Sequence, residues 1–183
     1  SAENLAQVSL ELGGKSPLVI FKDADIESAV NGVLLSIFSA SGQSCVAASR
    51  LLLEDTIHDE VLARVVERAG QIRIGDPLDE TSQMGPLATQ LQVSRIDAIV
   101  AQAQTQGAEL MHGGRKPPGL ERGWFYEPTV VACPSQSLPI VQEELFGPVV
   151  SAIKFKNEAE AVRLANDTRF GLASGPVSYT HLT

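Results

Sequence analysis

Short apolar runs alternate along the chain with longer stretches in which apolar residues recur every three or four positions. The continuous run PLVIF at residues 17–21 is typical of a buried strand in a parallel sheet. The next stretch predicts a helix that begins after Asp23 or Asp25 and ends near Ser41 and Gly42, with Gly42 as a C-terminal cap. Its apolar face comprises Ile26, Ala29, Val30, Val33, Leu34, Ile37 and Phe38.

The same alternation continues toward the end of the chain. Further helices are predicted where Thr56, Thr89 with Gln92, and Asn157 with Glu160 offer N-caps ahead of periodic apolar residues. An exposed loop is expected at residues 113–123, and further strands are expected at residues 50–54, 108–111, 126–131 and 148–155. This order of elements predicts an α/β fold with a mainly parallel sheet flanked by helices.

Composition and charge narrow the classes of function. The 183 residues are 44% hydrophobic, which is enough for one domain with a real core. The formal net charge is −8 and the Lys and Arg residues are scattered, so we expect no nucleic-acid or anionic membrane partner. No apolar run approaches the length of a membrane span, and the first residues lack the layout of a signal peptide. These features favour a soluble, cytoplasmic protein that acts on small molecules.

The cysteines and histidines indicate neither a disulfide framework nor a metal site. Cys45 and Cys133 are the two cysteines, too few for such a framework, and Cys133 is interpreted as a semi-buried thiol without a special role. The three histidines have no metal-ligand spacing, either with one another or with the cysteines. We therefore expect no metal.

Cys45 and Glu11 are the candidate reactive residues. Cys45 follows Gly42 on an expected tight turn, whose backbone N–H groups can favour the thiolate and stabilise an oxyanion. Taken alone, a free cysteine is more often a small buried hydrophobe. Glu11 lies between Leu10 and Leu12 in a strand-like stretch, where a glutamate would usually be the solvent-facing residue of the strand. A thiol nucleophile and a carboxylate base could together form and hydrolyse a covalent intermediate.

Four segments resemble the motifs of the aldehyde dehydrogenase family. LELGGK at residues 10–15 and SASGQSCVAASR at residues 39–50 resemble the two family signatures, and Cys45 follows Glu11 by 34 residues, as expected for the family. QEELFGPV at residues 142–149 resembles the nicotinamide-contacting segment, and NDTRFGL at residues 166–172 resembles a fourth motif. The resemblance spans about residues 3–175, and four motifs in this order are far more specific than a lone Gly-x-x-Cys.

The resemblance implies a reaction and a role for each of four residues. Cys45 would be the catalytic nucleophile, and Glu11 would be the general base for the hydrolytic water, which favours a partly buried carboxylate. Glu144 would accept hydrogen bonds from the nicotinamide ribose, and Phe146 would pack near the nicotinamide ring. The implied reaction is oxidation of an aldehyde to a carboxylic acid through a Cys45 thiohemiacetal and thioester, with NAD or NADP as the cofactor. The intact enzyme would be a homo-oligomer.

The resemblance also implies that parts of the family's architecture are missing. Residues 1–175 correspond to an incomplete catalytic domain, and Ser1 lies too close to Glu11 to leave room for the nucleotide-binding domain, which we expect to be absent. Residues 176–183 depart from the family pattern, so we expect this divergent tail to be truncated or foreign.

Two other classes of function stay open. In a cofactor-independent thiol ester hydrolase, Cys45 and Glu11 would turn over an activated ester without nicotinamide, and ester turnover without added NAD would identify it. In an inert, non-catalytic fragment, the domain folds but its thiol is neither exposed nor activated. A profile of thiol reactivity against pH would identify that case.

We predict that the 183-residue polypeptide by itself does not oxidise aldehydes. Glu144 and Phe146 would contact only the nicotinamide end of the cofactor. The binding free energy of these contacts is too small to offset the translational and rotational entropy that a dinucleotide loses on binding. The sequence carries no phosphate-binding βαβ unit before Glu11 that could hold the rest. Mixing the purified polypeptide with an aldehyde and NAD or NADP should give no steady rise in the absorbance of reduced nicotinamide. A steady rise that depends on Cys45 would contradict this prediction.

Overall fold

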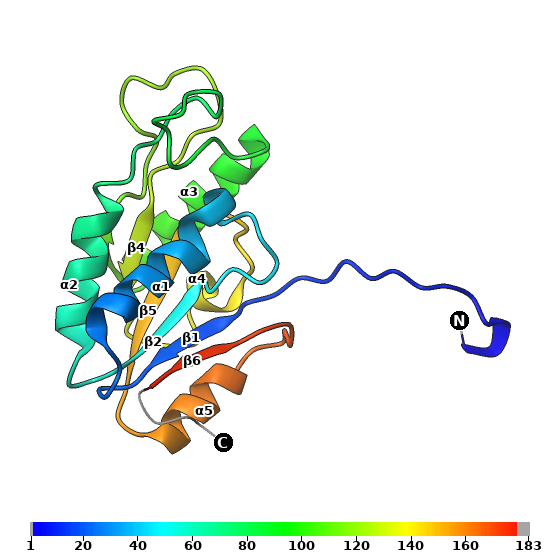
Figure 1. Ribbon diagram of the computed structural model, residues 1–183, viewed down its shortest axis with the longest axis vertical. Helices are drawn as coiled ribbons and strands as arrows, with labels where there is room; N and C mark the ends of the chain where they lie inside the picture. Colours follow the sequence, from blue (N-terminus) through cyan, green and yellow to red (C-terminus); the bar gives the residue numbers. More distant parts are fainter. Residues whose placement is uncertain (1, 179–183) are drawn as a thin grey trace.

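One six-stranded sheet runs through the body of the molecule (Figure 1). The computed structural model describes residues 2–178 of the chain. The strand order is β3-β4-β5-β2-β1-β6, and every neighbouring pair is parallel except β3 with β4. The predicted mainly parallel sheet is therefore confirmed. The strands are β1 (Pro17–Ile20), β2 (Arg50–Glu54), β3 (Glu109–His112), β4 (Thr129–Ala132), β5 (Val149–Phe155) and β6 (Gly175–Val177).

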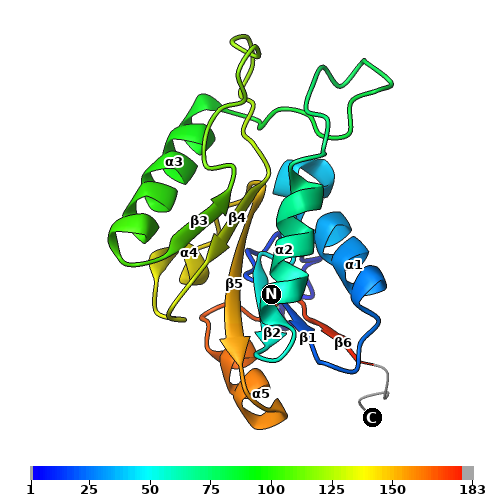
Figure 2. The same cartoon turned by 90° about the vertical axis from the view of Figure 1, so that its left-hand side faces the viewer.

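Helices cover both faces of this sheet, as Figure 2 shows. Alternate residues of a strand point to opposite faces, so Leu51 and Leu53 of β2 pack into one core and Leu52 into the other. The first core lies under α1 (Ile26–Phe38) and α2 (His58–Ala69). The second lies under α3 (Gln90–Thr105), α4 (Pro139–Gln142) and α5 (Glu158–Asn166). Burial on both faces explains why the strands are continuous apolar runs.

Three of the predicted helix caps form. The side chains of Asp25, Thr89 and Asn157 each accept a hydrogen bond from the backbone N–H three residues later, at the start of α1, α3 and α5. The predicted cap at Thr56 is wrong, since α2 has Ile57 at its N-cap without a side-chain bond. The Ile57 N–H instead bonds the Glu54 carbonyl, and this turn carries the chain out of β2 before the helix begins.

The strand-like stretch around Glu11 does not form a strand within the described residues. Residues 6–16 form neither helix nor strand, and residues 2–13 extend away from the body as an arm (Figure 1), called the N-terminal arm below. The side chains of Leu10 and Leu12 are 69% and 56% exposed. Backbone groups of a strand need a neighbour to pair with, and no strand among residues 2–178 pairs with residues 6–13. An alternating pattern alone therefore does not make a strand here.

The end of the described chain adds a strand that the sequence did not predict. β6 pairs with β1 from Leu18 and Gly175 to Ile20 and Val177, so the sheet continues two residues beyond the boundary expected at residue 175. Residues 179–183 of the expected tail lie outside the described residues, and the origin of this tail stays a prediction. Among the helices within residues 2–178, none combines the length and the apolar character that crossing a membrane requires.

Candidate functional site

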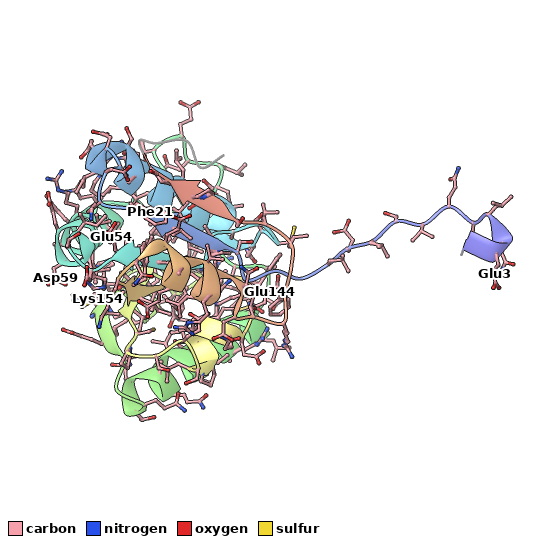
Figure 3. All side chains as sticks on the ribbon, turned by 90° about the horizontal axis from the view of Figure 1, so that it is seen from below. Glu3, Phe21, Glu54, Asp59, Glu144 and Lys154 are labelled. Carbon is pink, nitrogen blue, oxygen red and sulfur yellow. The ribbon has the colours of Figure 1, made fainter. Side chains whose placement is uncertain are left out.

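Three segments that are distant in sequence line one hollow at the base of the N-terminal arm. Its volume is about 470 Å³, within the usual range of small-molecule sites. Figure 3 shows Glu144 where the arm leaves the body. The lining residues include all four candidates predicted from sequence; they are Glu11, Leu12, Gly13, Gln43, Ser44, Cys45, Glu144 and Phe146.

The segment that carries Cys45 begins with a strained turn. Helix α1 ends at Phe38, several residues before the predicted end, because Ala40, Ser41 and Gly42 all have left-handed backbone conformations, with φ of 50°, 56° and 70°. Such a conformation costs a residue other than glycine about 1–2 kcal/mol. Backbone strain of this kind persists only where surrounding contacts hold it in place. Residues 39–46 are called the thiol turn below.

Two side chains of the thiol turn bind the segment that precedes α3. The Ser41 hydroxyl donates a hydrogen bond to the Gly85 carbonyl at 2.8 Å. The Gln43 side-chain oxygen accepts one from the Ala88 N–H at 2.8 Å. These bonds fix the turn from which Cys45 projects.

The two cysteines lie in different environments. Cys45 is half-buried in the hollow, whereas Cys133 is buried in the second core, where burial raises the pKa of its thiol to about 11. The backbone N–H of Cys45 makes no hydrogen bond within residues 2–178, so this donor is unused. Cys45 therefore has the accessibility that a nucleophile needs, and Cys133 does not.

Glu144 joins the third segment to the first. Its Oε1 accepts a hydrogen bond from the Gly14 N–H at 2.9 Å. Gly14 also lies directly against the backbone oxygen of Cys45, with which a Cβ at this position would collide. Glu143 points elsewhere, with its carboxylate 3.2 Å from Arg169 and 3.8 Å from Arg95. The two adjacent glutamates therefore face different sides.

Phe146 lies on a second strained turn, residues 143–148, called the Phe146 turn below. It has φ of 53°, and its side chain is 41% exposed at the hollow. The side-chain amide of Gln92 donates hydrogen bonds to the carbonyls of Leu145 and Phe146. Gly42, with φ of 70°, packs so tightly against the Gly147 carbonyl that a Cβ there would collide with it. The thiol turn and the Phe146 turn are thus in direct contact.

Glu11 reaches the hollow from the N-terminal arm. Within residues 2–178 the Glu11 side chain is exposed where the arm leaves the body. No other described segment covers this part of the arm. Glu11 therefore shares the hollow with Cys45 but, unlike Glu144, is not enclosed by protein.

Two basic side chains, Lys15 and Arg50, are buried near the segments that carry the site residues. Arg50 donates hydrogen bonds to the carbonyls of Lys15, Leu164 and Ala165 at 2.7–2.8 Å, which ties the start of β1 to the end of α5. The Lys15 ammonium has no hydrogen-bond partner within the described residues. Burial, together with the charge of Arg50, lowers the pKa of Lys15 to about 7. Lys15 is 2% exposed.

Sequence reasoning missed the side chains that hold the site together. Ser41, Gln43 and Arg50 all lie inside a recognised motif, yet nothing in the motif indicates what they bind. Gln92 fits a capping box, which assigns it a local role at the start of α3 instead of a contact 53 residues away. Within residues 2–178, no group of three or more His, Cys, Asp or Glu side chains could hold a metal ion.

Comparison with known proteins gives consistent matches. A model described as "Aldehyde dehydrogenase family" matches residues 1–180. The chain is 50% identical over 176 residues to (Z)-2-((N-methylformamido)methylene)-5-hydroxybutyrolactone dehydrogenase of Acinetobacter baylyi, covering 96% of this chain and 36% of that protein. It is 43% identical over 177 residues to betaine aldehyde dehydrogenase of Brucella anthropi, with the same two coverages.

A solved structure agrees with these relatives. Betaine aldehyde dehydrogenase of Staphylococcus aureus, crystallised in complex with NAD⁺, superposes with a TM-score of 0.92 and 39% identity. The match covers 97% of this chain and 36% of the other. The chain thus spans about a third of the length of the proteins that it resembles.

We predict that limiting alkylation labels Cys45 at least ~10-fold faster than Cys133, because only the thiolate reacts. With a pKa of about 11, Cys133 is ionised in roughly one molecule in a thousand at pH 8, and it is also buried. Treating the folded protein with substoichiometric iodoacetamide and mapping the labelled peptides measures the ratio. Preferential labelling of Cys133 would remove Cys45 as the nucleophile.

Proposed function

Because the chain belongs to the aldehyde dehydrogenase family, we propose that it supplies the catalytic thiol of an enzyme that oxidises an aldehyde to a carboxylic acid with NAD or NADP. The observation that supports this proposal is the single hollow lined by Cys45, Glu11, Glu144 and Phe146. The relatives are dehydrogenases by name, which disfavours the thiol ester hydrolase and inert-fragment alternatives. Since the chain spans 36% of their length, the activity of the whole protein is part of the proposal.

The hollow suits the nicotinamide end of the cofactor. Glu144 presents a carboxylate, of which Oε1 already binds the Gly14 N–H, and this charge can accept further hydrogen bonds from ribose hydroxyls. The exposed part of the Phe146 ring offers a flat apolar surface to the nicotinamide ring. When bound there, the nicotinamide supplies the acceptor for a hydride. Glu144 and Phe146 are therefore the residues that we assign to cofactor binding.

Cys45 performs the first step. Its thiolate attacks the carbonyl carbon of the aldehyde, and the new C–S bond pushes the carbonyl electron pair onto oxygen. The free N–H of Cys45 can donate to this oxyanion, which stabilises the charge as it forms. Loss of a hydride from the same carbon restores the C=O bond and leaves a thioester on Cys45. The rigid thiol turn keeps the sulfur in one place through both changes.

Glu11 serves the second step. It removes a proton from a water molecule, whose oxygen attacks the thioester carbon. The C–S bond then breaks, the carboxylic acid leaves, and Cys45 returns as thiolate. Glu11 and Cys45 line the same hollow, which supports this assignment. A base at this position favours hydrolysis over transfer of the acyl group to coenzyme A.

We assign a small aldehyde as the substrate, in keeping with relatives named as betaine aldehyde dehydrogenases. We further propose a cytoplasmic homo-oligomer without nucleic-acid or membrane partners. The net charge of −8 supports the absence of nucleic-acid and anionic membrane partners, and the unpaired Cys45 and Cys133 support a reducing compartment.

Replacing Glu11 by Gln in the complete protein should slow hydrolysis of the acyl-enzyme by about 10²–10⁴-fold and leave its formation nearly unchanged. The amide keeps the shape of the side chain and cannot take up the proton. Rapid-mixing kinetics would show a burst of reduced nicotinamide followed by a much slower steady phase.

The matched control is Glu3→Gln, which removes the same charge from the far end of the N-terminal arm (Figure 3) and should leave both phases intact. If the Glu11 variant acylates slowly and hydrolyses normally, Glu11 is not the base.

Replacing Glu144 by Gln in the complete protein should slow hydride transfer roughly 10- to 100-fold, the worth of a hydrogen bond to a charged group. Alkylation of Cys45 should change little, because the Gln oxygen can still accept the Gly14 N–H. Both rates are read from stopped-flow traces and timed iodoacetamide labelling. Glu143→Gln is the control, since this neighbour faces Arg95 and Arg169 outside the hollow. An unchanged rate of hydride transfer would exclude Glu144 from the site, whereas equal loss of both rates would indicate misfolding.

A further inference from the structure

The thiol turn and the Phe146 turn share one support, the segment Gly85–Gln92. This segment carries none of the residues assigned to catalysis or cofactor binding. Near its start, Gly85 and Ala88 bind Ser41 and Gln43 of the thiol turn through their backbone carbonyl and N–H groups. At its end, Gln92 binds the Phe146 turn. The distance between the two turns is therefore set partly by a third element.

The contacts of Gln92 differ from those expected of its place in the helix. Thr89 caps α3 by accepting from the Gln92 N–H at 3.2 Å, and in a capping box the Gln92 side chain would return to the Thr89 N–H. It instead points outward from the first turn of α3. Its single NH₂ group donates to two successive carbonyls, those of Leu145 and Phe146, the second at 3.0 Å.

These two carbonyls flank the strained backbone of the Phe146 turn. Phe146 has a bulky side chain, and its backbone φ is 53°. Bulky residues rarely adopt this left-handed conformation unless neighbouring contacts hold it. On one side, Leu145 is anchored in the core at 1% exposure, and on the other Gly147 packs against Ile96 of α3. Between these anchors, the Gln92 amide is the polar contact that holds the Phe146 carbonyl in place.

We propose that Gln92 is a positioning residue, which holds the Phe146 turn in its left-handed conformation and so fixes the surface that receives the nicotinamide. The effect on catalysis rests on the proposed function, because the turn matters for turnover only if nicotinamide binds there. The effect on the backbone of the turn is independent of the proposed function. Gln92 acts through the Leu145 and Phe146 carbonyls, so a group at position 92 that cannot donate a hydrogen bond should release the turn.

The first test measures the backbone directly, without cofactor. In the complete protein, Gln92→Ala and Gln92→Glu should each increase hydrogen exchange of a peptide spanning residues 143–149 by about 10-fold or more. The glutamate has the same length but lacks the donor, and an acidic residue suits the first turn of a helix, so α3 should stay folded. Gln92→Lys restores a donor and should recover part of the protection. Gln90→Ala is the control, because Gln90 is exposed in the same helical turn and its side-chain amide donates a hydrogen bond to the Ser94 hydroxyl.

The second test measures the two halves of the hollow separately. The dissociation constant of NAD or NADP should rise about 10-fold in Gln92→Ala and Gln92→Glu. The rate of Cys45 alkylation should change less than the dissociation constant does, because Ser41 and Gln43 also hold the thiol turn, through hydrogen bonds in which Gln92 takes no part.

The outcomes separate this inference from the proposed function. Unchanged exchange at residues 143–149 would overturn the positioning role, and weaker cofactor binding in the same variants would then mean that Gln92 touches the cofactor itself. Exchange that rises equally in the strands β2 and β5 would also overturn it, since Gln92 would then stabilise the fold in general. If exchange rises only in the turn but the unmodified protein binds no nicotinamide cofactor, the positioning role stands and the proposed function fails.

Discussion

The close approach at Gly14 is the constraint on which the candidate site depends. Its N–H binds the Glu144 carboxylate, and its α-carbon lies against the backbone oxygen of Cys45, so one residue contacts both of the other segments of the hollow. Any side chain at this position would push Cys45 away from the segment that carries Glu11. The glycine is required here by space, since no positive φ angle demands it.

The sheet determines where this approach occurs. Cys45 precedes β2 and Phe146 precedes β5, each by a few residues, and Gly14 precedes β1 in the same way. These three strands are neighbours, with Pro17 opposite Arg50 and Arg50 opposite Ser151. The hollow therefore lies at the amino ends of three adjacent parallel strands. Open α/β sheets more often bind ligands at the carboxyl ends. At this edge of the sheet, Arg50 at the start of β2 donates hydrogen bonds to one carbonyl just before β1 and another near the end of α5.

Local sequence patterns predicted the individual strands and helices better than the way in which the strands pair. Continuous apolar runs such as PLVIF identify strands because both faces of the sheet are covered, and Asp25, Thr89 and Asn157 identify helix starts because they cap them. The order in which the strands pair is a property of long-range packing, so the adjacency of β5, β2 and β1 was not visible in any one segment. The alternating pattern around Glu11 has no partner strand within residues 2–178, so no strand forms there.

The strained turns show why the missed residues matter. Ala40, Ser41 and Phe146 each have left-handed backbones, at a cost of about 1–2 kcal/mol apiece. A neutral hydrogen bond contributes about 0.5–1.5 kcal/mol to stability. A few side-chain hydrogen bonds therefore offset the free-energy cost of these turns, and no single bond greatly exceeds the cost of one left-handed residue. Ser41, Gln43 and Gln92 supply such bonds from within or beside the turns themselves. Because strain and support are nearly matched, the positions of Cys45 and Phe146 depend on side chains that carry no chemistry of their own.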